Sequence, residues 1–248
     1  MHSYQPTAAD IVRLHSCDVL IYTGGESEKW VAEVIKQSDN KNLKALNLIE
    51  LLGDKAVTER EEGTERRENG DETDEHIWLS LKNAEILINK IAAALGDADN
   101  KNKDIYKTNA AKYAERLAAL DKEYTEALKN AKHKAMIFAD RFPFRYLTED
   151  YGLDYYAAFP GCSAETEASF ETVIFLAKKA DENGDCIFIT ETSNGDIARA
   201  ANRNTAKKNK KILTLDSMQS VNKKDIKNGM TYISVMQKNL ETLKIGVE

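Results

Sequence analysis

Several features are scarce or missing in this chain of 248 residues, and each absence excludes a class of protein. The three cysteines show no CxxC or other paired spacing, so neither a disulfide framework nor a thiolate zinc site is indicated. We expect Cys17, Cys162 and Cys186 to be buried as small hydrophobic side chains. No run of about 18 apolar residues could span a membrane, and no signal peptide opens the sequence.

Excess positive charge is also missing. The formal net charge of −6 is concentrated in residues 53–75, which hold ten acidic and four basic residues, and the rest of the chain is close to neutral. A protein that binds nucleic acid would need a basic face, so the charge argues against a nucleic-acid partner. The acidic loop could attract cations, although a solvated loop is the plainer interpretation of such a charge run.

The clearest pattern that is present is an apolar stripe in residues 104–130, formed by Tyr106, Ala110, Tyr113, Leu117, Leu120, Tyr124 and Leu128. Its spacing of three or four residues predicts one long helix, which no Gly or Pro interrupts and which Asp104 can cap. At about 1.5 Å per residue this helix reaches roughly 40 Å, enough to join two lobes. We therefore predict an N-terminal α/β lobe over residues 1–101, a linking backbone helix over 102–132, and a C-terminal α/β lobe over 133–248.

The N-terminal part shows a short α/β pattern. After Pro6 and the helix cap Thr7, the sequence predicts a helix over 8–15, a strand within 18–25 that ends in a glycine turn, a helix over 28–36, and a strand over 43–48. A further helix begins near residue 76 and ends at Gly96. A stable sheet usually needs about three or more strands, so this lobe is expected to be incomplete.

The C-terminal part alternates strands with helices. Expected strands cover 135–138, 155–159, 186–190 and 211–215, and expected helices cover 144–151, 167–180, 196–208 and 230–243. Such alternation is typical of a parallel sheet with right-handed crossovers. The predicted fold class is α/β, with parallel sheets in both lobes.

Acidic residues follow strands of the predicted C-terminal sheet. Ligands of an open parallel sheet bind beyond the carboxyl ends of its strands, and there the sequence has Asp140, Glu191 and Asp216. His76 lies at the start of a helix directly after the acidic loop, and His2 precedes the first helix. Imidazole and carboxylate groups without thiolate suit zinc, manganese and similar divalent metals.

Each of these residues also has a plain structural interpretation. His2 could belong to a frayed terminus, and His76 could cap a helix or pack in the core. Asp216 could cap a helix, and Asp140 could pair with a nearby arginine. Spacing alone leaves the choice between ligand and structural role open for each residue.

Several separate motifs carry a resemblance to a known family. They are MHSYQPTAADIVRL, DVLIYTGGESEKWV, DEHIWLSLKNAEILINKIAAAL, FPFRYLTEDYGLDYYAAFPGCSAETEASFETVIFLAKK and LTLDSMQSV. With the long helix, they resemble the zinc- and manganese-binding solute receptors of bacterial ABC transporters, over nearly the whole chain and in the same order. The resemblance implies two α/β lobes joined by a rigid helix, with a metal cleft between the lobes.

The resemblance also implies a set of metal ligands. The HSYQPTAAD motif places His2 at the family's first histidine ligand, and DEHIWLS places His76 at the second. In LTLDS, Asp216 falls at the carboxylate ligand.

At the third ligand position this sequence departs from the family. Relatives often show Ser-His or Ser-Glu there, whereas this chain has FADRFPFRYL. The position falls on Arg141, or on Asp140 after a shift of one residue. Arginine does not bind a metal, so Asp140 is the expected ligand and Glu191 is a substitute.

The beginning of the sequence also differs from the family pattern. Relatives carry a signal sequence, often a lipid-anchor cysteine, and further secondary structure before HSYQP, whereas this chain starts inside that motif. We expect a truncated or internal-start version of an extracytoplasmic receptor, which is periplasmic or lipid-anchored in its full-length form. Missing strands would leave a bare sheet edge that pairs with a second copy, so a dimer is expected. The acidic loop occupies the place of a His-rich metal-gathering loop but has no histidine, so any such role would be electrostatic.

The implied function is capture of a divalent metal, Zn2+ in preference to Mn2+, and its delivery to a transporter permease, without catalysis. Nitrogen-rich ligation favours zinc, whereas manganese tolerates more oxygen. One alternative is a metal-dependent hydrolase, although the sequence contains no HExxH, GxSxG or Walker motif. Another is a surface protein for cell adhesion in which the metal is only structural.

Overall fold

Two compact units make up the part of the chain that the structure describes. The computed structural model describes residues 4, 6–58, 73–161 and 167–248. Described residues up to Ala119 belong to the first unit, and those from Leu120 to Glu248 belong to the second. Two α/β lobes with parallel sheets and a long helix confirm the predicted fold class. Within the described ranges, no helix has the length and apolar character needed to span a membrane.

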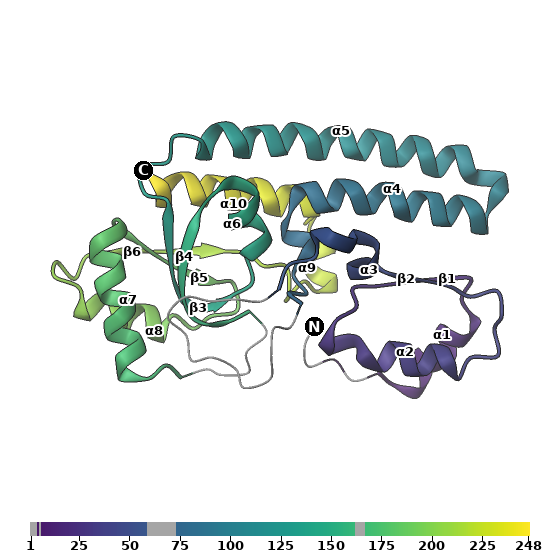
Figure 1. Ribbon diagram of the computed structural model, residues 1–248, viewed down its shortest axis with the longest axis horizontal. Helices are drawn as coiled ribbons and strands as arrows, with labels where there is room; N and C mark the ends of the chain where they lie inside the picture. The colour runs from purple at the N-terminus through teal and green to yellow at the C-terminus, as the bar shows by residue number, and fades with distance from the viewer. Residues whose placement is uncertain (1–3, 5, 59–72, 162–166) are drawn as a thin grey trace. The chain divides into compact units, whose positions relative to one another are not determined.

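The first unit contains a parallel sheet of two short strands. β1 (Val19–Tyr22) pairs with β2 (Lys44–Asn47), so both strands predicted for this part are confirmed. The helices are α1 (Ala8–Ser16), α2 (Lys29–Lys36), α3 (Leu48–Leu52), α4 (Leu81–Ala98) and the first part of α5 (Lys103–Leu128). Short 3-10 turns lie at Glu26–Glu28, Gly53–Lys55, Ile77–Leu79 and Asn100–Asn102. α1 contacts α2, and α4 contacts both strands (Figure 1).

α1 begins where the sequence predicts, because its first turn is capped. The Thr7 hydroxyl accepts the main-chain N–H of Asp10 at 3.3 Å, and the Asp10 carboxylate accepts the N–H of Thr7 at 3.0 Å. The Tyr4 hydroxyl donates to the same carboxylate at 2.8 Å. These reciprocal bonds satisfy N–H groups that a helix start leaves without internal partners.

Two glycines follow β1 for a steric reason. Gly24 and Gly25 have φ angles of +90° and +80°, in the left-handed region that residues with a Cβ rarely adopt. A Cβ on Gly24 would overlap the Asn47 side chain, and a Cβ on Gly25 would overlap the Glu75 side chain. The turn therefore brings the main chain close to two polar side chains of the first unit.

The second unit contains a four-stranded parallel sheet in the order β4–β3–β5–β6. Its strands are β3 (Ala135–Phe142), β4 (Asp154–Pro160), β5 (Cys186–Thr190) and β6 (Lys211–Leu215). Its helices are α6 (Arg145–Tyr151), α7 (Phe170–Asn183), α8 (Asp196–Asn204), α9 (Lys223–Lys227) and α10 (Tyr232–Val247). All four predicted strands and their parallel direction are confirmed, although β3 continues beyond its predicted end to Phe142.

Alternate residues of this sheet face different layers. Ile137 of β3 belongs to a core cluster with Leu176 of α7 and with residues of α8. Phe138 instead stacks on Phe188 of β5, with 5.9 Å between ring centroids. Gly246 of α10 lies against the ring of Phe188. α7 and α8 thus cover one face of the sheet, and α10 covers the other (Figure 1).

The long helix α5 has the predicted packing face. Five residues of the predicted stripe are buried: Ala110, Leu117, Leu120, Tyr124 and Leu128. The boundary between the two units falls between Ala119 and Leu120, inside this helix. In the second unit the Tyr124 hydroxyl donates to the main-chain oxygen of Met236 in α10 at 2.6 Å. The apolar residues of α5 that recur every three or four positions are therefore the residues that this helix packs against its neighbours.

Gly96 has a different role from the predicted one. A 3-10 turn over Ile77–Leu79 follows His76, and α4 then continues past Gly96 to Ala98. Gly96 is buried, and a Cβ at this position would press on the side chain of Lys103. The glycine thus permits a close approach to the start of α5 instead of ending α4.

Helix ends and short helices account for the remaining differences. α7 begins at Phe170, later than predicted, because the Ser169 hydroxyl accepts the N–H of Thr172 and caps the helix. α8 ends at Asn204, before its predicted end. α3 and α9, which were not predicted, have five residues each and are too short to show a helical apolar period.

The described residues include two of the three cysteines. Cys186 is buried and Cys17 is half-buried, and both are free thiols. Burial raises the pKa of the Cys186 thiol, so this residue packs as a hydrophobic side chain and is not a reactive thiolate. Cys162 lies outside the described residues, as do residues 59–72 of the acidic loop.

Candidate metal centre

His76 is the candidate histidine that the structure describes. It precedes the turn Ile77–Leu79, and its side chain is fully buried. Oδ1 of Asp74 lies 2.8 Å from the main-chain nitrogen and 2.8 Å from the ring nitrogen Nδ1 of His76. The main-chain N–H donates to this oxygen, and a proton on Nδ1 lets the ring donate to it as well. In that tautomer Nε2 carries the lone pair that a metal ion would require.

Glu75, between these two residues, holds the turn after β1. Its side chain is buried, and Oε1 accepts the main-chain N–H of Ser27 at 2.8 Å. Oε2 accepts the hydroxyl of Ser27. In the segment 74–76, the Asp74 carboxylate therefore orients the His76 ring. The Glu75 carboxylate binds the turn between β1 and α2.

Asp140 lies inside β3, not directly after it, because this strand is longer than predicted. The register with β4 shifts between Phe138 and Arg141, so Asp140 occupies a local irregularity of the strand. Oδ2 accepts the main-chain N–H of Thr190 at 3.0 Å and its hydroxyl at 2.5 Å, and Oδ1 accepts the N–H of Arg141 at 2.8 Å. A carboxylate has about four lone-pair sites, so these bonds leave further capacity on Oδ1.

Glu191 follows β5 and binds the loop after β6. Oε2 accepts the main-chain N–H of Ser217 at 2.8 Å. Oε1 accepts the hydroxyls of Ser217 at 2.9 Å and of Ser220 at 3.3 Å. Both oxygens therefore support the loop, and the role of substitute ligand stays a prediction for this residue.

Asp216 directly follows β6, as the sequence predicts. Its Oδ1 accepts the main-chain N–H of Met218 at 2.8 Å. Burial raises the pKa of the Asp216 carboxyl, the N–H of Met218 opposes this rise, and the nearby negative charge of Glu191 adds to it. A cation bound here would offset the cost of holding a partly buried negative charge.

Hydrogen bonds link the segments that carry Asp140, inside the last part of β3, Glu191, after β5, and Asp216, after β6. Asp140 binds Thr190, the next residue Glu191 binds Ser217, and Ser217 adjoins Asp216. Because the strands are parallel, the three acids lie toward the end of the second sheet at which its strands finish.

The predicted ligands do not all lie within the described residues. His2 is outside them. His76 belongs to the first unit, and Asp140 and Asp216 belong to the second. In the part of the chain that the structure describes, no group of three or more His, Cys, Asp and Glu side chains is arranged to hold a metal ion. The assignment of these four residues as ligands therefore stays a prediction.

Five residues that support the site were not predicted: Asp74, Glu75, Thr190, Ser217 and Asn239. The spacing Asp-x-His could have indicated Asp74, since Asp side chains often accept a main-chain N–H two residues later. Asn239 could have been found as a polar residue on the apolar face of α10, formed by Met236, Leu240 and Leu243. Thr190 contacts a residue of another strand, which leaves no local pattern.

Comparison with known proteins identifies the family. The family model described as "ZnuA: Zinc-uptake complex component A periplasmic" matches residues 1–246. The chain belongs to the ZnuA family. The resemblance to bacterial metal receptors is therefore confirmed.

Individual ZnuA-family relatives match nearly the whole chain. It is 34% identical over 251 residues to "Zinc-binding lipoprotein AdcA" of Streptococcus pneumoniae serotype 4, which covers 98% of this chain and 48% of AdcA. It is 27% identical over 247 residues to "High-affinity zinc uptake system protein ZnuA" of Bacillus subtilis, which covers 98% of this chain and 76% of that protein. The chain therefore spans about half the length of the AdcA protein that it matches.

A solved structure of the ZnuA family supports the fold. The Zn(II)-bound ZnuA-like domain of Streptococcus pneumoniae AdcA superposes with a TM-score of 0.76 at 30% sequence identity. The match covers 99% of this chain and 86% of that domain. The fold of this chain is therefore similar to the fold of that domain.

Proposed function

We propose that this chain captures a divalent metal ion, zinc in preference to manganese, outside the cytoplasm and delivers it to the permease of an ABC transporter. The observation that carries the proposal is the buried His76, whose Nδ1 lies 2.8 Å from the Asp74 carboxylate. Metal-ligating histidines almost always pair their other ring nitrogen with a carboxylate, a carbonyl or water. Two relatives are named as a zinc-binding lipoprotein and a high-affinity zinc uptake protein, which supports zinc as the cargo.

The proposed ligands are His2, His76, Asp140 and Asp216, with Glu191 as the substitute for Asp140. Two neutral imidazoles and two carboxylates would neutralise the charge of a divalent cation. Two nitrogen donors favour zinc, because manganese prefers sites that are richer in oxygen. The ratio of the two affinities is therefore the quantity that decides the preferred metal.

The proposed activity is reversible binding without catalysis. A metal-dependent hydrolase needs an open metal position and a group that takes a proton from the attacking water. In the proposed set Asp140 and Asp216 are ligands, and both oxygens of Glu191 accept hydrogen bonds from the loop after β6. None of these three carboxylates is then assigned to take a proton from water, which supports binding in preference to hydrolysis.

We also propose that a strand edge of the first unit is available to a second copy of the chain. Within the described residues, β1 and β2 pair with no other strand than each other, and Ile21 of β1 is exposed. An unpaired strand edge can add another strand. Size-exclusion chromatography with light scattering should then give the mass of a dimer, and a stable monomer would contradict this part of the proposal.

The main test is metal binding by the purified, metal-dialysed chain after it is reloaded with zinc or manganese. The wild-type chain should hold about one equivalent of zinc and bind it more tightly than manganese. His76→Ala should lose the metal, whereas His133→Ala should keep it, because His133 is a partly exposed histidine outside the proposed set. Elemental analysis measures the stoichiometry, and calorimetry measures the affinity.

Three results would contradict the proposal. A wild-type chain without stoichiometric metal would show that it is not a metal receptor. A His76→Ala chain that binds as the wild type does would remove the observation on which the proposal depends. Tighter binding of manganese than of zinc would reverse the proposed preference.

A further inference from the structure

Both ends of β6 are held by asparagine side chains. Among the described strands, β6 lies at one side of the second sheet and pairs with β5. The N–H of Lys211 donates to the main-chain oxygen of Asp185 at 2.8 Å, toward β5. Because main-chain groups of successive strand residues point to opposite sides, Lys210 and Asp216 turn theirs away from β5.

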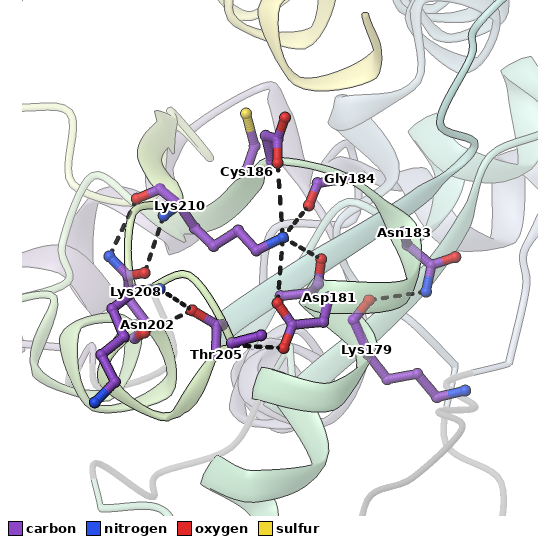
Figure 2. A network of polar contacts seen from close by, with 12 residues as sticks. Lys179, Asp181, Asn183, Gly184, Cys186, Asn202, Thr205, Lys208 and Lys210 are labelled. Atoms are coloured by element: carbon purple, nitrogen blue, oxygen red, sulfur yellow. Dashed lines mark hydrogen bonds and ion pairs between the residues drawn. The ribbon is translucent and has the colours of Figure 1, made fainter.

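The two residues that flank β6, Lys210 and Asp216, each have their main-chain N–H and C=O bound by one asparagine side chain. Asn239 of α10 accepts the N–H of Asp216 at 2.9 Å and donates to its C=O at 2.8 Å. Asn202 of α8 accepts the N–H of Lys210 at 3.0 Å and donates to its C=O at 3.1 Å (Figure 2). Each side-chain amide therefore takes the place that a peptide group of a further strand would take.

Asn239 is a buried polar residue whose hydrogen bonds are made to Asp216. It is 1% exposed and lies on the helix face that carries Met236 and Leu240, which are also buried. Burial of an amide costs free energy unless hydrogen bonds replace those to water. Both the oxygen and the nitrogen of this amide are used on the main chain of Asp216, so the position of Asp216 is tied to α10.

The same arrangement orients the Asp216 carboxylate. Met218 has a φ angle of +59°, and its N–H donates to Oδ1 of Asp216 at 2.8 Å. Ser217 lies between Asp216 and Met218 in the chain. Its main-chain N–H and its hydroxyl both donate to the Glu191 carboxylate. With the main chain held by Asn239 and Oδ1 held by Met218, Oδ2 accepts no hydrogen bond from the described residues.

We infer that Asn239 is a positioning residue for metal binding, which acts by fixing the direction in which Asp216 presents Oδ2. The inference rests on the proposed function, in which Asp216 is a ligand. A ligand that is already oriented loses less conformational freedom when the metal binds. Residues that orient metal ligands typically change metal affinity by about 10–100-fold when they are replaced.

The test compares wild-type protein with Asn239→Leu and Asn202→Leu. Both variants exchange an amide for an apolar group of similar size and remove two equivalent hydrogen bonds to one end of β6. The two ends are about 20 Å apart, because a strand rises about 3.3 Å per residue. Competition with a chromophoric chelator measures zinc affinity, and the visible spectrum of the Co2+-loaded protein reports the ligand geometry.

We expect Asn239→Leu to bind zinc about 10–100-fold more weakly than the wild type and to change the cobalt spectrum. Asn202→Leu should keep the wild-type affinity and spectrum, although both variants should unfold at lower urea concentration. Should Asn239→Leu fail to fold, Asn239→Ser keeps one hydroxyl for hydrogen bonding and is expected to show a smaller loss in the same direction.

Wild-type affinity and an unchanged cobalt spectrum in the folded Asn239 variant would overturn the positioning role and leave zinc binding intact. Equal losses of affinity in both asparagine variants would also overturn it, since general destabilisation would then explain the result. A wild-type chain that binds no zinc would refute the proposed function itself, and the inference with it.

Discussion

The Asp74 carboxylate contacts His76 twice through one oxygen, at the main-chain nitrogen and at ring Nδ1, both at 2.8 Å. Asp74→Asn should weaken zinc binding by about 10–100-fold, because an amide stabilises the required tautomer less well than a carboxylate does. Asp97→Asn is the matched control, since Asp97 is exposed on α4. Chelator competition gives both affinities, and equal zinc binding by the two variants would contradict a role for the Asp74–His76 pair.

Thr190 should contribute to stability through its bonds to Asp140. Its buried hydroxyl donates to the carboxylate at 2.5 Å, so Thr190→Val removes a hydrogen bond to a charged group. We expect the free energy of unfolding to fall by about 1.5–3 kcal/mol. Urea denaturation measures this change. Thr214→Val, at an exposed position of β6, should change it by less than about 0.5 kcal/mol, and equal losses would contradict the prediction.

Lys210 places a buried ammonium group between several segments of the second unit (Figure 2). Nζ donates to the carbonyls of Ala180 at 2.9 Å and Gly184 at 2.6 Å. It also lies 3.5 Å from the Asp181 carboxylate and 3.7 Å from that of Asp185. Lys210→Met should lower the free energy of unfolding by roughly 2–4 kcal/mol, because two carbonyls lose their donor.

Lys211→Met is the control for this prediction. Lys211 is the next residue and is exposed, so its replacement should change the free energy of unfolding by less than about 0.5 kcal/mol. Urea denaturation of both variants gives the comparison. A loss in Lys210→Met no larger than in Lys211→Met would show that the buried ammonium does not stabilise the second unit.

Asp10 should make the start of α1 sensitive to acid. Hydrogen bonds from the Thr7 hydroxyl and main-chain N–H lower the pKa of the Asp10 carboxyl to about 2, below its ordinary value of 3.8. Because the folded pKa is the lower one, the stabilisation is present above about pH 4 and is lost as the pH falls through 2. Carbon-13 NMR titration of the carboxyl should show this value in the wild type and a higher one in Thr7→Val. An ordinary pKa in the wild type would contradict the capping contribution.

Much of the fold could be predicted because the strands are short apolar runs with clear ends. The stretch VLIY is followed by Thr23 and two glycines, and CIFIT is preceded by Asn-Gly-Asp. Both stretches form strands where expected. The prediction that Gly96 ends α4 is wrong, because a tertiary contact and not the local sequence pattern decides the role of this glycine. The local pattern of a glycine after an apolar helix indicates a helix end, but packing against Lys103 decides its role.

A residue of the candidate site could be predicted only where a side chain able to bind a metal directly follows a predicted strand. Asp216 follows a strand directly, and its place at the carboxyl end of β6 could be derived from the alternation of strands and helices. The bonds from Thr190 to Asp140 and from Asn239 to Asp216 span 50 and 23 residues of sequence, and they depend on which strands and helices become neighbours. Such tertiary pairings leave no period or spacing in the chain.

The asparagines that bracket β6 have a consequence for solubility. An exposed edge strand is a template on which a foreign strand can start to aggregate. Asn202 and Asn239 already occupy the outward main-chain groups at both ends of β6, which is only five residues long. The outward main-chain groups of Lys210 and Asp216 are therefore already used, and an added strand could pair only with the residues between them.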